Sequence, residues 1–330
     1  MIGRFFRRLA KVAVVRGATL SPILSWRMKG IRETGNVTIL NLHRVSEDTG
    51  STYSPLPPSL FRELLRFVVQ NYQPTTFTEL RRVATIAKKP LLVLSFDDGY
   101  RDFIDVAIPI AEEFGVLLNQ NVIPGCIESA LPPLNVLAQD FVGQAPRSML
   151  RELEVPGFDV RIDRTHRSEF GIALSRFLKN RPKSEQRELF NCLVPQFYRL
   201  DSFRPAEMMT LKQVREIAGR HEIGVHSFEH ASMSHESLDY FVDDFERCRT
   251  YFHTNFNRSI EIYAFPNGEY TNAQVDYLKK QGVPNILLVG EKFSHHDDDV
   301  WHRITLHASS AAEVRFRATG AWAKTARNLA

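Results

Sequence analysis

Short apolar runs alternate with longer amphipathic stretches along most of the chain. The strand-like runs fall at residues 37–42, 91–94, 116–123, 222–225, 260–265, 286–289 and 300–307. Between them, apolar side chains recur at helical spacing, as at residues 58–68, 210–218 and 238–256. This alternation predicts an α/β fold whose parallel strands form a barrel-like sheet.

The segment 124–207 departs from this alternation. It shows no period of two, and helical patches recur within it at residues 169–179 and 184–197. We expect an inserted helical lobe that covers the substrate groove, within one catalytic domain over residues 36–310. A C-terminal helix is expected within residues 311–330.

Two adjacent carboxylates, Asp97 and Asp98, follow the apolar run at residues 91–94. That run is typical of a strand buried on both faces, and ligands of α/β sheets bind at the carboxyl ends of such strands. Gly99 permits a tight turn, so one carboxylate can hold a metal while its neighbour handles a proton. The alternative interpretation is a solvated Asp-Asp-Gly turn, and only a second motif with suitable ligands would favour a metal site over it.

A partner motif follows the strand-like residues 222–225. His226 and His230 lie four residues apart, and both rings can meet one cation if the segment turns helically. Two imidazoles and one carboxylate would leave open positions for water and substrate, as in a catalytic zinc-type site. Taken alone, the pair also fits surface or core histidines.

These motifs resemble those of one family. Residues 95–99 (Ser-Phe-Asp-Asp-Gly) and 226–230 (His-Ser-Phe-Glu-His) are similar to two signatures of the polysaccharide deacetylase (NodB-homology) family of carbohydrate esterases. Residues 39–45 resemble its opening strand, and 263–268 (Tyr-Ala-Phe-Pro-Asn-Gly) its aromatic-Pro-x-Gly motif. The motifs keep the family's order. The resemblance covers roughly residues 36–310 and implies a distorted (β/α) barrel of the NodB-homology type with an inserted helical lobe.

The resemblance also implies roles for the motif residues. Asp98, His226 and His230 would hold a divalent metal ion, zinc first, with cobalt, nickel or manganese as alternatives. Asp97 would be the base that removes a proton from water, because a bound cation brings the pKa of water within its reach.

Two catalytic assignments rest on looser matches. Many family members carry an arginine near Pro266 that orients the base, and the corresponding position here is Ala264. We expect Arg303 to take its place. His307, at the end of the last strand, is the candidate general acid. For Arg303 and His307 the alternative interpretation is packing at the sheet end.

Four further residues are expected at the pocket. The turn at Pro266 and Asn267 would aim a backbone N–H at the oxyanion. His43, at the end of the first strand, and Tyr100, after the Asp-Asp-Gly turn, would lie beside the substrate. A lone histidine at a strand end also fits a structural role.

Two other groups of polar residues keep open interpretations. Asn119 and Asn121 stand where family members usually carry apolar residues, and they fit either the pocket or a hydrogen-bonded structural role. Residues 295–299 (His-His-Asp-Asp-Asp) fit a second metal site or a solvated loop.

The expected reaction is hydrolysis of an N-acyl group, most simply acetyl, from an amino sugar in surface-polysaccharide or glycolipid biosynthesis. One alternative is a deformylase or deacylase of a lipid-linked sugar at the membrane surface, and another is a non-catalytic glycan-binding relative. A glycosyltransferase using Asp97 and Asp98 for a metal-nucleotide would leave the histidines without a role, and no Gly-rich phosphate loop supports it.

Composition narrows the choice of partners. The chain has 330 residues, of which 43% are hydrophobic and 24% charged, which is ordinary for a globular protein with a large core. The net charge of +4 comes without a basic-aromatic recognition motif, so no nucleic-acid partner is expected. The three cysteines are widely spaced, which favours free thiols over disulfides or a cysteine metal site.

Residues 1–35 form a basic amphipathic leader. It is too short and too charged to span a bilayer and lacks a convincing signal-peptide cleavage site. We expect a helix that packs on the domain or makes a peripheral contact with an anionic membrane surface. The expected location is cytoplasmic, at the inner membrane face, with export by an uncleaved leader as the alternative.

Overall fold

Seven parallel strands close into a barrel in the computed structural model, which describes residues 15, 17, 21–47, 50–321 and 323. The order around the barrel follows the chain, and the last strand returns to the first. The strands are β1 (Asn36–Leu42), β3 (Leu91–Asp98), β4 (Asn119–Val122), β5 (Glu222–Val225), β6 (Ile262–Ala264), β7 (Asn285–Val289) and β9 (Val300–Thr305). The predicted barrel-like α/β fold is therefore confirmed.

Two short strands extend the sheet outside the closed ring. β2 (Gln73–Pro74) pairs in parallel with β3, and β8 (Ser294–His295) pairs antiparallel to β1. They cover the amino-terminal ends of the two neighbouring central strands, since their partners are Leu91, Leu92, Asn36 and Val37.

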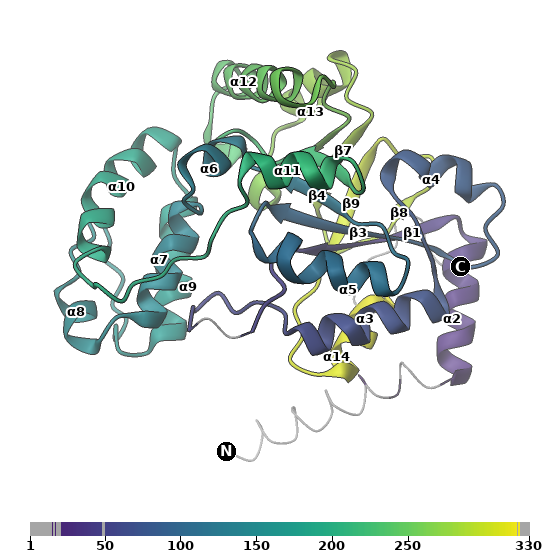
Figure 1. Ribbon diagram of the computed structural model, residues 1–330, viewed down its shortest axis with the longest axis horizontal. Coiled ribbons are helices and arrows are strands. Elements are labelled where there is room, and N and C mark those ends of the chain that lie inside the picture. The colour runs from purple at the N-terminus through teal and green to yellow at the C-terminus, as the bar shows by residue number, and fades with distance from the viewer. Residues whose placement is uncertain (1–14, 16, 18–20, 48–49, 322, 324–330) are drawn as a thin grey trace.

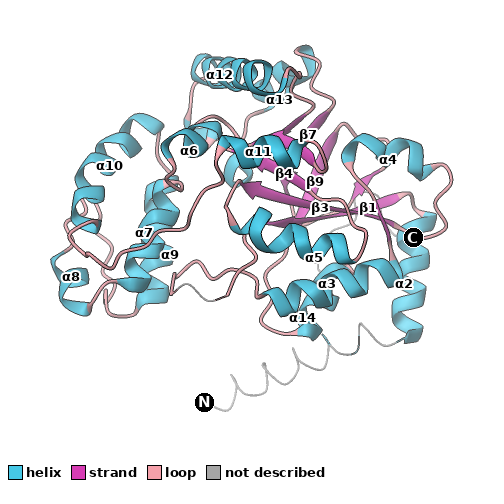
Figure 2. Cartoon of the chain, viewed as in Figure 1, coloured by secondary structure: helices cyan, strands magenta, loops and turns pink. Residues whose placement is uncertain are grey.

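Helices cover the outer face of the barrel (Figures 1 and 2). Their bounds are α2 (Ser21–Glu33), α3 (Pro58–Asn71), α4 (Phe77–Ala84), α5 (Ile108–Glu113), α11 (Leu211–Ala218), α12 (Leu238–Phe256), α13 (Asn272–Lys280) and α14 (Ala311–Ala318). A π-helical turn, Phe103–Ala107, leads into α5. Figure 1 shows α3, α5 and α14 on one side of the sheet and α12 and α13 on the opposite side.

The barrel interior changes from apolar to polar along each strand. Because alternate residues face inward, β1 contributes Val37 and Ile39 and then Asn41. On β9, Trp301 is followed inward by Arg303, and both side chains are fully buried. The amino-terminal half of the barrel is thus a packed core, and its carboxyl-terminal half holds polar side chains.

Residues 124–207 contain a helical lobe between β4 and α11. Its helices are α6 (Pro124–Ser129), α7 (Leu134–Gln144), α8 (Arg147–Glu152), α9 (Arg167–Lys179) and α10 (Lys183–Phe197). The lobe has an apolar core of its own, in which the Phe141 ring stacks on Phe197 at a centroid distance of 4.5 Å. Figure 1 shows it to one side of the barrel.

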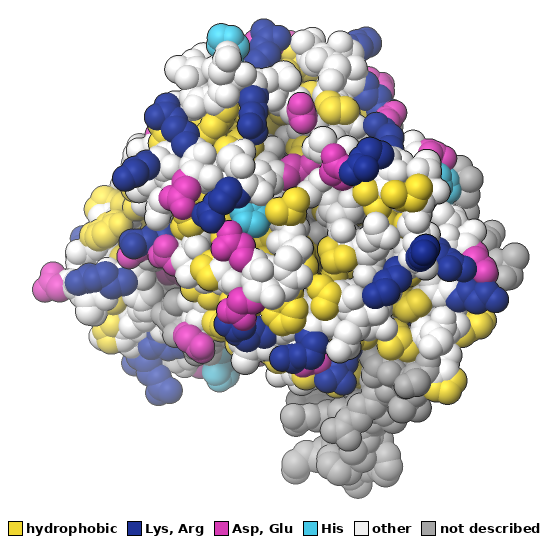
Figure 3. All heavy atoms as spheres, turned by 45° about the vertical axis from the view of Figure 1, so that its right-hand side comes forward, with side chains coloured by type: hydrophobic (Ala, Val, Ile, Leu, Met, Phe, Trp, Pro, Cys, Tyr) yellow, Lys and Arg dark blue, Asp and Glu magenta, His cyan; other side chains and the backbone are white. Residues whose placement is uncertain are grey.

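The predicted leader lies partly outside the described residues, as do the last residues of the chain. Within the described part, Met28 and Ile31 of α2 are buried in the main core, so α2 packs on the barrel. None of the described helices combines the length and apolarity needed to cross a membrane. On the face seen in Figure 3, acidic and basic side chains are interspersed, as the small net charge would suggest. The three cysteines are free, as predicted.

Candidate metal centre

A pocket of about 320 Å³ lies at the carboxyl ends of the barrel strands. Its floor is built from the polar inward positions of the strands and the loops that follow them. Both Asp97 and Asp98 line it, together with His226 and His230, so the two predicted motifs meet in one place. The opposite wall comes from α7 and α9 of the lobe.

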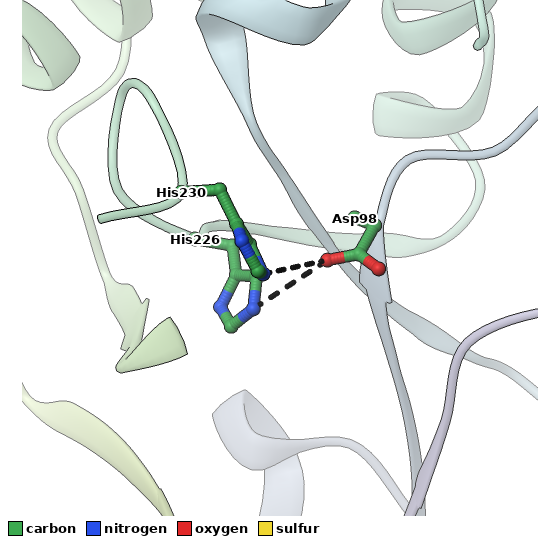
Figure 4. A group of neighbouring side chains, drawn as sticks. All are labelled: Asp98, His226 and His230. Atoms are coloured by element: carbon green, nitrogen blue, oxygen red, sulfur yellow. Dashed lines mark ion pairs between the residues drawn. The ribbon is translucent and has the colours of Figure 1, made fainter. Parts of the chain in front are cut away.

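Three side chains converge as ligands of one cation would (Figure 4). The distance from Asp98 Oδ1 to His226 Nε2 is 3.6 Å, and to His230 Nε2 it is 3.5 Å. All three residues are buried. Among the described residues, Asp98 Oδ1 has no hydrogen-bond partner, although a buried polar atom ordinarily has one.

The histidines reach this arrangement through a loop. The segment does not turn helically, because residues 226–230 carry positive φ angles of +60° at Ser227 and +58° at His230. These left-handed turns fold His230 back beside His226, with ring centroids 5.2 Å apart. Asp244 of α12 holds the loop by accepting hydrogen bonds from Phe228 N at 3.0 Å and Ser227 Oγ at 3.3 Å.

The protonation states suit a divalent cation. Burial lowers the pKa of both His226 and His230, so their rings are neutral and carry a free lone pair at neutral pH. His226 Nδ1 donates to Ala264 O at 2.8 Å, which leaves Nε2 as the ligating atom. Burial, and then the neighbouring Asp97 carboxylate, raise the pKa of Asp98 to about 8, so its anionic form needs a positive charge beside it. The residues therefore fit a bound divalent metal.

The pKa of Asp97 is shifted in the opposite direction to that of Asp98. Burial alone would raise the pKa of Asp97, but the guanidinium of Arg303, and then His226, hold it well below its usual range. Its Oδ1 accepts from Arg303 Nη1 at 2.7 Å and from Asn121 Nδ2 at 2.8 Å, while Oδ2 lies 3.9 Å from His226 Nε2. Asp97 is thus an ionised carboxylate held beside the candidate metal centre.

The structure brings most other predicted residues to the same pocket. His43, Asn267 and His307 line it, although His307 lies two residues beyond the end of β9. Burial, and then Arg317, lower the pKa of His307. Pro266 is buried in the turn before Asn267 and does not line the pocket.

Tyr100 also lies outside the pocket lining. Its ring is fully buried beneath the guanidinium of Arg44, whose carbon is 5.2 Å from the ring centroid. Sequence reasoning placed Tyr100 beside the substrate because it follows the Asp-Asp-Gly turn. Gly99, whose φ is +90°, carries the Tyr100 ring into the core, and a role of Tyr100 at the substrate or oxyanion stays a prediction.

Several pocket residues gave no signal in the sequence. Tyr53 comes from the loop after β1, and its ring contacts His43 edge-on at 5.9 Å. Burial, and then Asp98, keep the pKa of Tyr53 well above its ordinary value, so its phenol remains a donor. Arg176 and Lys179 reach the pocket from α9, where nothing in the helical pattern marked them.

A second group of potential ligands lies on the surface. His295, His296 and Asp297 have ligand atoms within 4.8 Å of one another, and they are only partly buried or exposed. His296 Nδ1 lies 2.9 Å from Asp297 Oδ1. Both interpretations of residues 295–299 therefore stay open.

Comparison with known proteins extends these observations. Residues 197–286 match the sequence model described as polysaccharide deacetylase. The matched range contains His226, His230 and Asn267, whereas Asp97 and Asp98 lie before it. No curated protein matched the chain by sequence.

Three solved structures share the fold. The deacetylase PplD of Streptococcus pyogenes, in complex with acetate, is 17% identical with a TM-score of 0.54, over 82% of this chain and 92% of that one. IcaB from Ammonifex degensii is 14% identical with a TM-score of 0.54, over 86% and 97%. A de-N-acetylase from Aggregatibacter actinomycetemcomitans is 16% identical with a TM-score of 0.51, over 81% and 94%.

The fold and the site together define an α/β barrel with a buried Asp-His-His group that could hold a metal. Residues 197–286 are similar to the polysaccharide deacetylase family, which is the family that the motifs at residues 95–99 and 226–230 predicted. The family variant with Ala264 in place of an arginine stays a prediction.

Proposed function

We propose that the protein removes the N-acetyl group of an amino sugar by hydrolysis. The observation that carries the proposal is the ionised, buried Asp97 beside the convergent Asp98, His226 and His230 at the floor of one pocket. Deacetylase activity of this kind agrees with the family match. The similar structures include a deacetylase bound to acetate and a de-N-acetylase, which supports acetyl as the acyl group.

Asp98, His226 and His230 would hold the metal, and zinc suits two neutral imidazoles and one carboxylate. When bound, a divalent cation polarises the acyl oxygen and makes water more acidic. Asp97 accepts the proton of the attacking water, and Arg303 and Asn121 fix the carboxylate through Oδ1, which leaves Oδ2 as the accepting atom.

The leaving nitrogen needs a proton. As the water oxygen bonds to the acyl carbon, the C–N bond breaks and the amine takes a proton from His307, the candidate acid that also lines the pocket. Because burial lowers the pKa of His307, its ring must first receive a proton, and Asp97 holds the one taken from water. The backbone near Asn267 would donate to the acyl oxygen as it becomes negative.

The substrate would be an acetylated amino sugar of surface-polysaccharide or glycolipid biosynthesis. The same proposal includes a lipid-linked sugar as substrate, which the protein would bind at the inner membrane face through residues 1–35. A deformylase of such a lipid-linked sugar is the alternative within this class.

The test is acetate release from N-acetylated sugars, nucleotide sugars and lipid-linked sugars, with metal content measured in the same samples. We expect Asp97→Asn to keep its metal and lose activity on the order of 10²–10⁴-fold, because it lacks the proton acceptor. His230→Ala should lose both metal and activity. His253→Ala, on the exposed side of α12, is the matched control and should change neither.

Three outcomes would overturn the proposal. Full acetate release by the metal-replete Asp97→Asn variant would remove the proposed base. A wild-type protein that binds no divalent metal would reject the metal centre. One that binds metal, releases no acetate from these sugars and releases formate from their N-formyl counterparts would reject the acyl group.

A further inference from the structure

One wall of the pocket carries two cations from the helical lobe. Ile172, Arg176 and Lys179 stand at i, i+4 and i+7 of α9, so they share one face of the helix. All three line the pocket that holds Asp97 and His230. The lobe therefore presents an apolar side chain and two positive charges to whatever occupies the site.

Neither cation has a counterion in the described part of the chain. No hydrogen bond or ion pair joins the side chain of Arg176 or Lys179 to a described residue, whereas Arg187 and Arg247 nearby both pair with Glu229. The acidic group acting on Lys179 is Glu269, which accepts from Ser234 Oγ at 2.6 Å and forms no ion pair with Lys179.

The two cations also act on each other. Burial lowers the pKa of Lys179; Glu269 opposes that effect, and the charge of Arg176 adds to it. Lys179 in turn contributes to the lowered pKa of His230, after burial, His226 and Lys183, so its charge is felt at the centre. Two like charges without a shared counterion in a half-enclosed pocket favour the entry of an anion.

The end of α9 is fixed relative to the candidate metal centre. Ser232 Oγ donates to Lys179 O at 2.6 Å and accepts from Asn267 Nδ2 at 2.9 Å. The last turn of the lobe helix is thus tied to the turn that contains the predicted oxyanion donor. The backbone that carries Arg176 and Lys179 accordingly keeps a defined position beside the site.

We infer that Arg176 and Lys179 form an anion subsite, so that the substrate is an N-acylated sugar bearing a phosphate or a carboxylate next to the reacting unit. This inference rests on the proposed function and deepens it by naming the substrate class. Arg176 can grip two oxygens of such a group at once, and Lys179 adds a point charge.

The test has to separate anion binding by Arg176 and Lys179 from a second physical role of the same side chains, which is stabilisation of their own helix. Cations in the last turn of a helix also interact favourably with the helix dipole. That role stabilises α9 but does not distinguish one sugar from another. The test therefore compares substrates and measures stability alongside.

The first experiment measures kcat and KM of Arg176→Gln, Lys179→Gln and the double variant. Its substrates are N-acetylglucosamine, N-acetylglucosamine 1-phosphate and an N-acetylated hexosaminuronic acid. Wild type should prefer an anionic sugar, and the preferred one shows whether phosphate or carboxylate is recognised. The double variant should lose roughly 10–100-fold in kcat/KM on it, mainly through KM, and stay within about twofold on the neutral sugar. Lys212→Gln, exposed on α11, is the matched control.

A second measurement does not depend on turnover. Glucose 1-phosphate has no acyl group, and its binding to the metal-loaded wild type should weaken in high salt and in the double variant by a similar factor. Binding that the metal alone provides would survive in the double variant. Unfolding curves of all variants report any loss of α9 stability.

The possible outcomes distinguish failure of the anion subsite from failure of the proposed function. Hydrolysis without preference for anionic sugars, together with unchanged glucose 1-phosphate binding in the double variant, overturns the anion subsite and leaves the proposed function standing. Absence of hydrolysis with binding lost only in the double variant overturns the proposed function and supports the subsite. A lower stability with unchanged preference and binding assigns the cations to the helix dipole and also rejects the subsite.

Discussion

Asp97 and Asp98 are adjacent in the chain but have opposite acid–base properties. Asp97 points into the barrel, where Arg303 keeps it ionised, whereas Asp98 leaves β3 with a φ of +77° and faces two neutral imidazoles. Successive residues of a strand face opposite ways, so a single Asp-Asp step can supply both a base and a metal ligand. The different roles of Asp97 and Asp98 follow from the direction in which each side chain points.

Replacing Arg303 should damage the base and spare the metal ligands. Arg303→Met removes the charge that lowers the pKa of the buried Asp97 and leaves that carboxylate with Asn121 as its remaining close partner. We expect roughly a 10–100-fold loss in kcat and a free energy of unfolding lower by roughly 3–5 kcal/mol, with metal content unchanged. Steady-state kinetics, metal analysis and denaturant unfolding measure the three effects.

Arg303→Lys is the control for this prediction. It retains the positive charge but lacks the planar fork, so it should recover part of both losses. If Arg303→Met kept wild-type kcat while binding metal normally, Arg303 would have no part in holding Asp97.

At the residue scale, the sequence indicated those site residues that form short motifs. Asp97, Asp98, His226 and His230 stand in two such motifs at strand ends, and the structure brings all four together. Arg303 lies 206 residues from Asp97, and only the family resemblance suggested their contact. Tyr53 and Lys179 had no signal, because a side chain from a loop or a helix face reaches the pocket only once the chain is folded.

At the element scale, the histidine loop depends on a buried carboxyl of α12. Burial raises the pKa of Asp244 to about 6, against the hydrogen bond from Phe228 N that lowers it. The folded protein therefore binds this proton more tightly than the unfolded chain does. The resulting stability is complete below the unfolded pKa of 3.8 and is lost as the pH rises through about 6.

Asp244→Asn should remove this pH dependence. The amide oxygen can still accept from Phe228 N, but the variant has no buried charge at neutral pH. Relative to the variant, the free energy of unfolding of the wild type should fall by on the order of 2–3 kcal/mol between about pH 4 and pH 7. Denaturant unfolding at several pH values measures the difference, and a constant difference across that range would contradict it.

Elements with strong local signals were predicted well, and their ends less so. The helix predicted over residues 238–256 has those bounds, and a capping box of Thr210 and Gln213 begins α11 where expected. The strand predicted over 300–307 ends at Thr305, so His307 lies in the following loop. Apolar periodicity shows that a strand exists, whereas its end depends on which neighbour continues the hydrogen bonding.

At the scale of the whole molecule, the chain combines two cores. The barrel supplies Asp97, Asp98, His226 and His230, and the lobe supplies only the facing wall of the pocket. The loss of strand periodicity over residues 124–207 predicted the lobe. The face of α9 that meets the pocket was not predictable, because it is set by packing of α9 against α7 and by the Ser232 contact with Lys179 O.

Because the two cores are separate, core substitutions should separate metal binding from substrate binding. Phe141→Ala in the lobe and Phe61→Ala beside Phe96 of the barrel each remove a fully buried ring and should each cost roughly 3–5 kcal/mol of stability. Phe141→Ala should raise KM and open α8 and α9 to limited proteolysis while metal content stays at the wild-type level. Phe61→Ala should lower metal content, because it loosens the packing under the strand that carries Asp98. Equal loss of metal in both variants would show that the lobe and the barrel stabilise the centre as one unit.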